Sequence, residues 1–391
     1  MLPRERCSGC TACAAVCPKQ CITMIPNRDG FLYPHIQDDA CIHCRKCEHA
    51  CPVLHCNTPT LKIPMAFASK NLNEDCRLKS SSGGVFSALA EHVIAQGGIV
   101  FGAAISEDKQ VKHISAENMN DLVCLRGSKY VSSFLGNTFW QVLQQLQSGR
   151  VVLFSGTPCQ VEGLLSFLKQ PYQNLLTVDF VCHGVPSAKV WKEYLKYQER
   201  QNGSKVHAVS FRNKETGWKY FSMKIGFANG SIYSAPMRDD PYLHAFLDNL
   251  CLRPSCHDCA FKGANRSSDI TLADFWGIQT VMPEEDDDRG TSLVFVHSEK
   301  GRSILEQLNG QITIKETDAA SAIDHNSAMV KSVPAYHFRQ YFFHMLGKKR
   351  FDKLVNNCFN PSYTVRLHRM ALIKASALLQ RKVKSNGEKQ K

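Results

Sequence analysis

The sequence lacks an apolar stretch long enough to cross a membrane. Its longest apolar region, residues 85–105, is interrupted by polar, charged and glycine residues that include Glu91, His92 and Gly97, whereas a spanning helix needs about 20 consecutive apolar residues. The N-terminus also lacks the apolar core of a secretory signal peptide. These absences argue against a membrane-spanning or secreted protein, and we expect a cytosolic one.

Strong charge is likewise missing from most of the chain. The formal net charge is +12, but residues 348–391 hold 12 of the 47 Lys and Arg and two of the 35 Asp and Glu, which gives +10. The rest of the chain is therefore near neutral. Because nucleic-acid binding needs a basic surface, which only this tail offers, we expect no nucleic-acid partner.

Cysteine, by contrast, is abundant. The chain has 18 cysteines in 391 residues, and ten of them precede residue 57. In a long chain without a secretory signal, such cysteines indicate metal or redox chemistry rather than disulfides. The length predicts two or three domains, and the 43% hydrophobic content allows each a buried core.

Eight of the cysteines form an internal repeat. Residues 7–18 and 41–52 both read Cys-x2-Cys-x2-Cys-x3-Cys-Pro, the spacing of bacterial ferredoxins with two [4Fe–4S] clusters, in which the fourth cysteine binds the other cluster. The spacing predicts one cluster on Cys7, Cys10, Cys13 and Cys51, and a second on Cys41, Cys44, Cys47 and Cys17. A pair of zinc sites, which would use two Cys-x2-Cys pairs, fits this even spacing poorly.

The residues around the repeat complete a small domain. Residues 22–25 and 31–36, joined through Asp29-Gly30, predict a hairpin. Cys21 and Cys56 are left over, and we interpret them as packing residues, with Cys21 the nearer to a cluster. A linker is predicted near residues 57–65.

The next segment carries a glycine-rich turn. Residues 79–84 read Lys-Ser-Ser-Ser-Gly-Gly and precede a predicted helix at 85–96 and a strand at 99–105. Free backbone N–H groups at such a helix start suit a phosphate or pyrophosphate. A simple capped helix start is the alternative interpretation.

Residues 151–182 predict a β-α-β unit. Strands at 151–155 and 175–181 flank a loop at 156–160 and a helix at 161–168. Parallel strands joined in this way present their carboxyl ends at one edge, where open α/β sheets bind ligands. We therefore expect Cys159 and Cys182 to face the same crevice.

A third group of cysteines follows. Cys251-x4-Cys256-x2-Cys259 needs a fourth ligand to hold a cubane cluster. Cys182 is the first choice and Cys159 the second, and zinc remains an alternative. Further elements predicted are a hairpin at 218–227 and 231–235, strands at 270–273 and 292–297, and a helix at 301–308.

The basic C-terminal segment predicts a helix at 370–379. It is interpreted as a solvated tail helix, with contact to a membrane surface or to a partner protein as the alternatives.

Several segments stand in the order typical of a known family. They are the two ferredoxin runs, Ser81–Gly84, Arg126–Tyr130, Gly156–Gln160, Cys182–Gly184 and Ser268–Gly277. Through them the chain resembles the coenzyme F420 hydrogenase/dehydrogenase beta-subunit family, fused to a two-cluster ferredoxin domain. The resemblance covers about residues 1–310.

The resemblance implies a fold of mixed α+β and α/β class. A bacterial ferredoxin-like domain, a mixed α/β flavin-binding domain and a helical tail would follow one another. The expected boundaries are 1–57 for the ferredoxin-like domain, 65–147 and 148–315 for parts like the N- and C-terminal beta-subunit domains, and 316–391 for the basic helical tail.

The resemblance also implies FAD as a cofactor. The residues expected at the cofactor are Ser81, Ser82, Gly83, Gly84, Arg126, Gly127, Ser128, Lys129, Thr157 and Cys159. A third [4Fe–4S] cluster near the flavin would use Cys182, Cys251, Cys256 and Cys259. His183 is the expected proton donor because an imidazole of ordinary pKa suits proton exchange, and a structural histidine is the alternative.

Two functions are compatible with these features. One is an enzyme that exchanges electrons with a ferredoxin or another redox protein and reduces or oxidises a small molecule or a coenzyme, with coenzyme F420 among those that relatives use. The other is a relay subunit of a larger dehydrogenase or hydrogenase. A zinc-dependent binding module is the third and weakest hypothesis.

Overall fold

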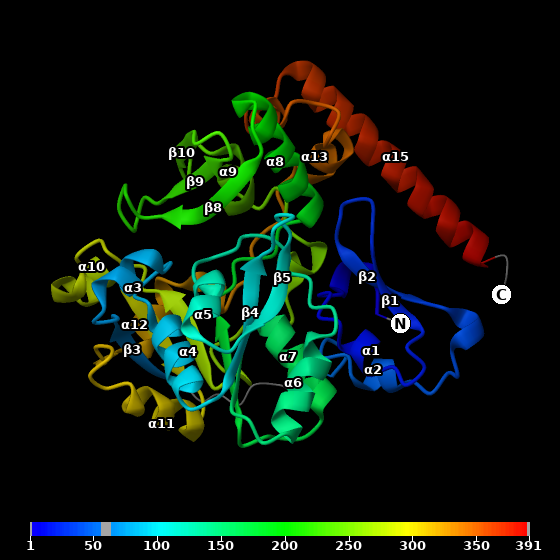
Figure 1. Ribbon diagram of the computed structural model, residues 1–391. Helices are drawn as coiled ribbons and strands as arrows, with labels where there is room; N and C mark the ends of the chain where they lie inside the picture. Colours follow the sequence, from blue (N-terminus) through cyan, green and yellow to red (C-terminus); the bar gives the residue numbers. More distant parts are fainter. Residues whose placement is uncertain (1, 56–63, 389–391) are drawn as a thin grey trace.

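The computed structural model describes residues 2–55 and 64–388, with side chains up to residue 375. Cys56 and most of the expected linker lie outside the described residues. A small N-terminal part, a large mixed sheet with its helices, and a smaller antiparallel sheet with further helices make up the molecule (Figure 1).

The N-terminal part contains the predicted hairpin. Its elements are η1 (Arg4–Arg6), α1 (Ala12–Ala15), β1 (Ile22–Pro26), β2 (Leu32–Ile36), η2 (Asp38–Ala40) and α2 (Lys46–His49). β1 and β2 pair antiparallel, with Ile22 opposite Ile36. Gly30 in the turn has φ +86°, and a Cβ there would lie 2.4 Å from Cβ of Lys189. Only glycine therefore allows the tip of the hairpin to pack this closely against the body.

An eight-stranded sheet forms the body, in the order β13-β3-β12-β11-β7-β6-β4-β5. The strands are β3 (Met65–Ser69), β4 (Ile99–Ile105), β5 (Val111–Ala116), β6 (Val152–Ser155), β7 (Leu175–Phe180), β11 (Ile270–Asp274), β12 (Ser292–Val296) and β13 (Lys315–Thr317). β4, β6, β7 and β11 are parallel, and the remaining neighbours are antiparallel. The segments expected as 65–147 and 148–315 thus share one sheet, and the boundary between them stays a prediction.

Helices cover both faces of this sheet. Around it lie α3 (Glu74–Lys79), α4 (Val85–Ala95), α5 (Met119–Leu125), α6 (Thr138–Gln147), α7 (Pro158–Leu168), α10 (Ile278–Val281), η4 (Pro283–Glu285), α11 (Glu299–Gln307), α12 (Ala319–Asp324) and η5 (Ser327–Met329). Val100 packs with α4 and α5, whereas its neighbour Phe101 packs with α6 and α7, since successive strand residues face opposite sides. Cys10 and Ala12 of the N-terminal part join the α6–α7 core.

The predicted β-α-β unit is present, but its helix starts earlier than expected. α7 begins at Pro158 rather than at residue 161 because Thr157 and Gln160 form a capping box with Pro158 in the first turn. The loop expected at 156–160 is therefore largely the start of a helix. Cys159 lies in that first turn.

The smaller sheet, ordered β10-β9-β8, packs with helices from two distant parts of the chain. Its elements are α8 (Ala188–Asn202), β8 (Val206–Asn213), β9 (Ser222–Phe227), β10 (Ile232–Pro236), α9 (Pro241–Leu247), η3 (Pro254–Asp258), α13 (Arg339–Met345) and α14 (Phe351–Phe359). Phe31 of the N-terminal hairpin enters this core and contacts Phe343, with ring centroids 6.0 Å apart.

The C-terminal segment is only partly a tail. Residues 315–359 supply β13, α12, α13 and α14, and they bury Tyr341, Phe342 and Phe351. α15 (Tyr363–Glu388) is longer than the helix predicted at 370–379 and projects away from the sheets (Figure 1). Within residues 2–55 and 64–388, no helix is long and apolar enough to cross a membrane.

Candidate iron–sulfur and cofactor site

One edge of the large sheet collects the residues that the sequence singles out. The parallel strands β6, β7 and β11 end there, followed by Cys159, Cys182 and Trp276. β3 also ends there because it pairs antiparallel to β12, with Ser69 opposite Ser292. The carboxyl edge of an open α/β sheet is the usual ligand position.

Three cysteines of the second run and Cys17 of the first run line a cavity. Cys17, Cys41, Cys44 and Cys47 line a space of about 280 Å³. Among the described residues, no three His, Cys, Asp or Glu side chains lie close enough to hold a single metal ion. A cavity ringed by four thiols fits a cubane cluster, whereas zinc needs its ligands around one point.

Cys21 also lines this cavity, as expected from the sequence. Its Sγ lies 3.4 Å from Sγ of Cys17.

The thiols of the first run form a second group. Burial raises the pKa of Cys10 to about 11, and the neighbouring thiols of Cys7 and Cys51 raise it further. Burial also raises the pKa of Cys13, with Cys10, Cys7 and Cys51 adding to the effect. Such grouped, buried thiols become thiolates only beside a strong positive charge, which an iron–sulfur cluster supplies.

A third group of thiols lies at the edge of the sheet. Burial raises the pKa of Cys182 to about 12, and Cys256 and Cys259 add to the shift. Burial raises the pKa of Cys159 as well, again with Cys259 and Cys182 contributing. The structure thus brings together four thiols, those of Cys159, Cys182, Cys256 and Cys259.

Cys251 is not brought to this group, although its spacing suggested that it would be. It is fully buried in the core beside Leu250 and Leu252. Burial raises its pKa to about 12, opposed by Arg339 and without a contribution from another cysteine. Its backbone carbonyl accepts a hydrogen bond from the N–H of Ser187. Packing therefore turns Cys251 away from Cys256 and Cys259.

α7 connects the first and third groups. A Cβ on Gly163 of this helix would lie 2.9 Å from Cβ of Cys10. Cys10 also contributes to the raised pKa of Cys159. Helix α7 therefore carries a third-group thiol at its start and touches a first-group residue one turn later.

Arg253 is a second connection, which the sequence analysis missed. Its Nε donates to the carbonyl of Cys7 at 2.7 Å, and Nη2 lies 3.7 Å from Sγ of Cys7. The side chain is 3% exposed, and its charge also acts to lower the pKa of Cys256, which burial raises. The sequence signal that could have identified Arg253 is its position three residues before Cys256.

The two segments expected at FAD lie side by side. The N–H of Ser128 donates to Oγ of Ser81 at 2.6 Å, and the two hydroxyls are 2.8 Å apart. Gly83 lies so close to the sheet that a Cβ would be 2.4 Å from the carbonyl oxygen of Ser69. Gly84 has φ +86° and precedes α4. Arg126, in contrast, pairs with Glu91 on α4 at 2.8 Å.

Two lysines beside the Ser/Gly turn have unusual pKa values. Burial lowers the pKa of Lys129 to about 7. Burial, followed by the charge of Arg212, also lowers the pKa of Lys214 to about 7. Nζ of Lys214 donates to the carbonyl of Ser82 at 2.7 Å. No local sequence signal identified Lys214.

The Ser268–Gly277 motif ends in a polar and aromatic network. Asp274 pairs with Arg212 and accepts a hydrogen bond from Nε1 of Trp218 at 2.9 Å. The guanidinium of Arg212 lies 4.3 Å from the ring centre of Phe221 and 5.5 Å from that of Trp276. Despite its burial, Arg212 has a raised pKa because Asp274 stabilises its charge.

His183 lies beside the third thiol group. Its ring contacts Phe246 edge-on, with centroids 5.1 Å apart. Burial lowers its pKa, and its Nε2 is buried without a hydrogen-bond partner. Nζ of Lys262 donates to the carbonyl of Cys182 at 2.7 Å.

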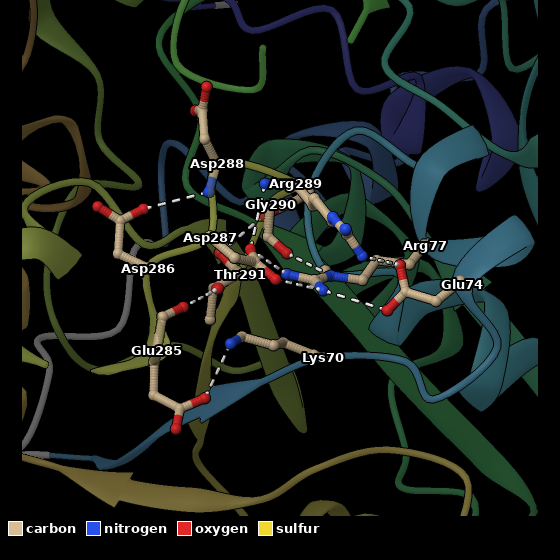
Figure 2. A network of polar contacts seen from close by, with 12 residues as sticks. Lys70, Glu74, Arg77, Glu285, Asp286, Asp287, Asp288, Arg289, Gly290 and Thr291 are labelled. Atoms are coloured by element: carbon tan, nitrogen blue, oxygen red, sulfur yellow. Dashed lines mark hydrogen bonds and ion pairs between the residues drawn. The ribbon is translucent and has the colours of Figure 1, made fainter. Parts of the chain in front are cut away.

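A polar network centred on Arg77 holds the loop at residues 285–291 (Figure 2). The buried guanidinium of Arg77 donates to both carboxylate oxygens of Asp287, at 2.6 and 2.8 Å, and to the carbonyl of Gly290 at 2.9 Å. The next residue, Thr291, accepts a hydrogen bond from Oγ of Ser82 at 2.8 Å. Arg77 thus holds in place the loop at residues 287–291, which in turn contacts the Ser/Gly turn.

We expect Arg77→Met to lower the free energy of unfolding by about 2–3 kcal/mol, because it removes charged hydrogen bonds and leaves Asp287 unpaired. Urea unfolding of the anaerobic protein, followed by tryptophan fluorescence, measures the change. Lys79→Met on the same helix is the control, since the Lys79–Asp75 pair is exposed and such pairs contribute under about 1 kcal/mol. Equal effects of the two variants would contradict the role of Arg77.

Two family models match parts of the chain. Residues 149–320 match the family described as the C-terminal part of the coenzyme F420 hydrogenase/dehydrogenase beta subunit. Residues 6–54 match the 4Fe-4S dicluster domain. Over residues 149–320 the chain is therefore similar to the coenzyme F420 hydrogenase/dehydrogenase beta subunit. The resemblance that the motifs carried is confirmed.

Proteins with known names are among those that the chain resembles. It is 21% identical to one subunit of the F(420)H(2) dehydrogenase of Methanosarcina mazei over 333 residues, which cover 81% of this chain and 86% of the relative. It is 27% identical to the coenzyme F420-dependent sulfite reductase of Methanocaldococcus jannaschii over 195 residues, 48% of this chain and 29% of the relative. A chain of the F420-reducing [NiFe] hydrogenase complex from Methanosarcina barkeri, 19% identical, matches 68% of this chain and 90% of its own length with a TM-score of 0.46.

Proposed function

We propose that the protein is an iron–sulfur flavoprotein oxidoreductase that passes electrons between ferredoxin-type clusters and FAD. The observation that supports this most is the succession of three groups of four thiols that leads from the N-terminal part to the ligand edge of the large sheet. Redox partners follow from the similarity to hydrogenase and dehydrogenase subunits. The free thiols and the clusters they would hold fit a cytosolic, reducing compartment.

The proposed ligand sets keep the predicted pairing of the first two clusters. One uses Cys7, Cys10, Cys13 and Cys51, and the other uses Cys41, Cys44, Cys47 and Cys17. For a third cluster we propose Cys159, Cys182, Cys256 and Cys259, with Cys159 in place of Cys251. When bound, these clusters carry single electrons, and their potentials depend on the charges and hydrogen bonds around the sulfurs.

The proposed FAD site lies at the Ser/Gly turn. Ser81–Gly84, Ser128 and Lys129 support it, because the start of a helix and a neighbouring lysine suit a pyrophosphate. Thr157 contributes less than expected because it is engaged in the capping box of α7. FAD would accept electrons one at a time and transfer two of them to the substrate. Nε2 of His183, which has no partner, remains the proposed proton donor.

Binding of FAD is expected to take up protons. Lys129 is mostly neutral at pH 8, because burial lowers its pKa to about 7. An anionic pyrophosphate beside it would raise that pKa, so the lysine would gain a proton on binding. Calorimetric titration of the flavin-free protein in two buffers of different ionisation enthalpy measures the uptake. Lys129→Met should bind more weakly with less uptake, and equal uptake in both proteins would contradict this site.

Anaerobic purification with iron, sulfide and flavin determined on one sample tests the proposal. About twelve irons and one FAD per chain are expected. Reduction with dithionite should then be followed by electron transfer to added coenzyme F420 or to another two-electron acceptor. Absence of flavin together with absence of any two-electron acceptor would overturn the enzyme assignment.

A relay subunit is the alternative function. The relative from Methanosarcina mazei is named as a subunit of a dehydrogenase, which favours a partner that holds the substrate site. In that case the isolated chain would reduce one-electron dyes and would reduce no two-electron substrate until the partner is added. The choice of substrate, with coenzyme F420 among the candidates, is part of the proposed function.

A further inference from the structure

The two cysteine runs fold alike but face different surroundings. The first run is covered by the body: Cys10, Thr11 and Ala12 are 8%, 6% and 0% exposed. The equivalent residues of the second run, Cys44, Arg45 and Lys46, are all exposed. The thiol group of Cys17, Cys41, Cys44 and Cys47, with Cys44 exposed, is therefore more open to solvent than the first group, in which Cys10 is buried.

The side chains of the two runs also differ, being small in the buried first run and large in the exposed second run. Positions filled by Gly9, Thr11 and Ala12 in the first run carry His43, Arg45 and Lys46 in the second. His43 and Arg45 have φ values of +53° and +57°, a backbone region that costs a residue with a Cβ about 1–2 kcal/mol. Large side chains thus occupy positions where the backbone alone would favour glycine or asparagine.

Lys19, His43, Arg45 and Lys46 form a surface that we call the cationic rim, in which Lys19, Arg45 and Lys46 carry the positive charges. All four are exposed and line the cavity ringed by the thiols. Glu48 also lines it, and Asp38 and Asp39 are exposed just before the run. Ile42, 57% exposed, adds an apolar side chain at the same place.

We propose that the cationic rim is the docking surface for a small acidic one-electron carrier protein, and that electrons are exchanged there with the cluster on Cys17, Cys41, Cys44 and Cys47. This inference rests on the proposed function. Complementary charge accelerates and orients such encounters, and an apolar residue among the charges is typical of an interface centre. The body outside the C-terminal tail is near neutral, so the rim is a local feature.

The test uses the full-length holoprotein and a plant-type [2Fe–2S] ferredoxin, an acidic protein, as the carrier. Stopped-flow spectroscopy measures reduction of the clusters by the reduced ferredoxin at low and high salt. We expect Arg45→Glu/Lys46→Glu to lower the second-order rate constant at least tenfold at low salt. The wild-type rate should fall with salt, whereas the rate of the variant should not. Arg45→Gln/Lys46→Gln should give an intermediate rate.

Two controls keep the outcomes distinct. Lys192→Glu/Lys353→Glu reverses two exposed charges on α8 and α14 and should leave the ferredoxin rate within about twofold. Reduced methyl viologen, a small cation, should reduce the rim variants at least as fast as the wild type. Normal viologen reduction with an unchanged ferredoxin rate would overturn the docking surface alone. Failure of viologen to reduce any cluster in the wild type would overturn the proposed function.

Discussion

Replacing Cys159 with serine is expected to lower the iron content from about twelve to about eight per chain. Burial raises the pKa of Cys159, and the thiols of Cys182 and Cys259 act in the same direction, so we propose Cys159 as the fourth ligand of their group. Serine binds iron far less well than a thiolate, so the third cluster should be lost. Iron and sulfide analysis of the anaerobically purified protein, with EPR of the remaining clusters, measures the effect.

Cys251→Ser is the matched control within the same chain. Cys251 is buried in an apolar core, so its replacement should leave iron unchanged and lower the free energy of unfolding by about 1–3 kcal/mol, the cost of burying a hydroxyl without a partner. The opposite pattern, with iron lost from Cys251→Ser and kept in Cys159→Ser, would restore the ligand set expected from spacing.

Replacing Arg253 with methionine is expected to shift the midpoint potential of the first cluster to a more negative value. The guanidinium lies 3.7 Å from Sγ of Cys7 and is almost fully buried, so its charge favours the reduced, more negative form of a cluster there. The loss of its hydrogen bonds to the carbonyls of Cys7 and Leu32 should also cost about 3 kcal/mol of stability. EPR-monitored redox titration and urea unfolding measure the two effects.

Arg253→Lys separates charge from geometry. Lysine keeps the positive charge but cannot donate in a fork to both carbonyls. Its potential should lie nearer to that of the wild type than the potential of Arg253→Met, while its stability should still fall. Equal potentials in all three proteins would show that Arg253 acts only as a structural residue.

The parts of the site that depend on local spacing were predictable. Each ferredoxin run specifies a loop by residues no more than four positions apart, and the Asp29-Gly30 turn specifies its hairpin. The strand–helix–strand order around Gly156 placed Cys159 and Cys182 at one edge, because parallel strands require it.

The third thiol group shows where spacing was insufficient. Cys159 and Cys259 are separated by β7 and the whole smaller sheet, and only the complete topology brings them together. Cys251 looked like their partner because it is close in sequence. The β-bridge between the adjacent Leu252 and Pro186 and the packing of the Cys251 side chain keep Cys251 away from the group. Neither feature produces a local sequence pattern.

Composition was also a poor guide to the C-terminal region. Basic residues between 348 and 391 suggested a tail, but Tyr341, Phe342 and Phe351 are buried beside Tyr194 and Phe31. Burial of aromatic residues outweighs surface charge in fixing such a segment. Similarly, Lys214 reaches the Ser/Gly turn from another sheet, a contact that no sequence window could contain.

The packing of Cys10, Ala12 and Phe31 into the cores of the body has a kinetic consequence. A redox domain on a flexible tether must diffuse between donor and acceptor, and its turnover then slows as solvent viscosity rises. Here the N-terminal part shares apolar side chains with the core of the smaller sheet and with the α6–α7 core, and these contacts hold it in place on the body. Internal electron transfer should therefore be a fixed-distance process, independent of added glycerol, and the N-terminal part should not survive excision as a separate domain.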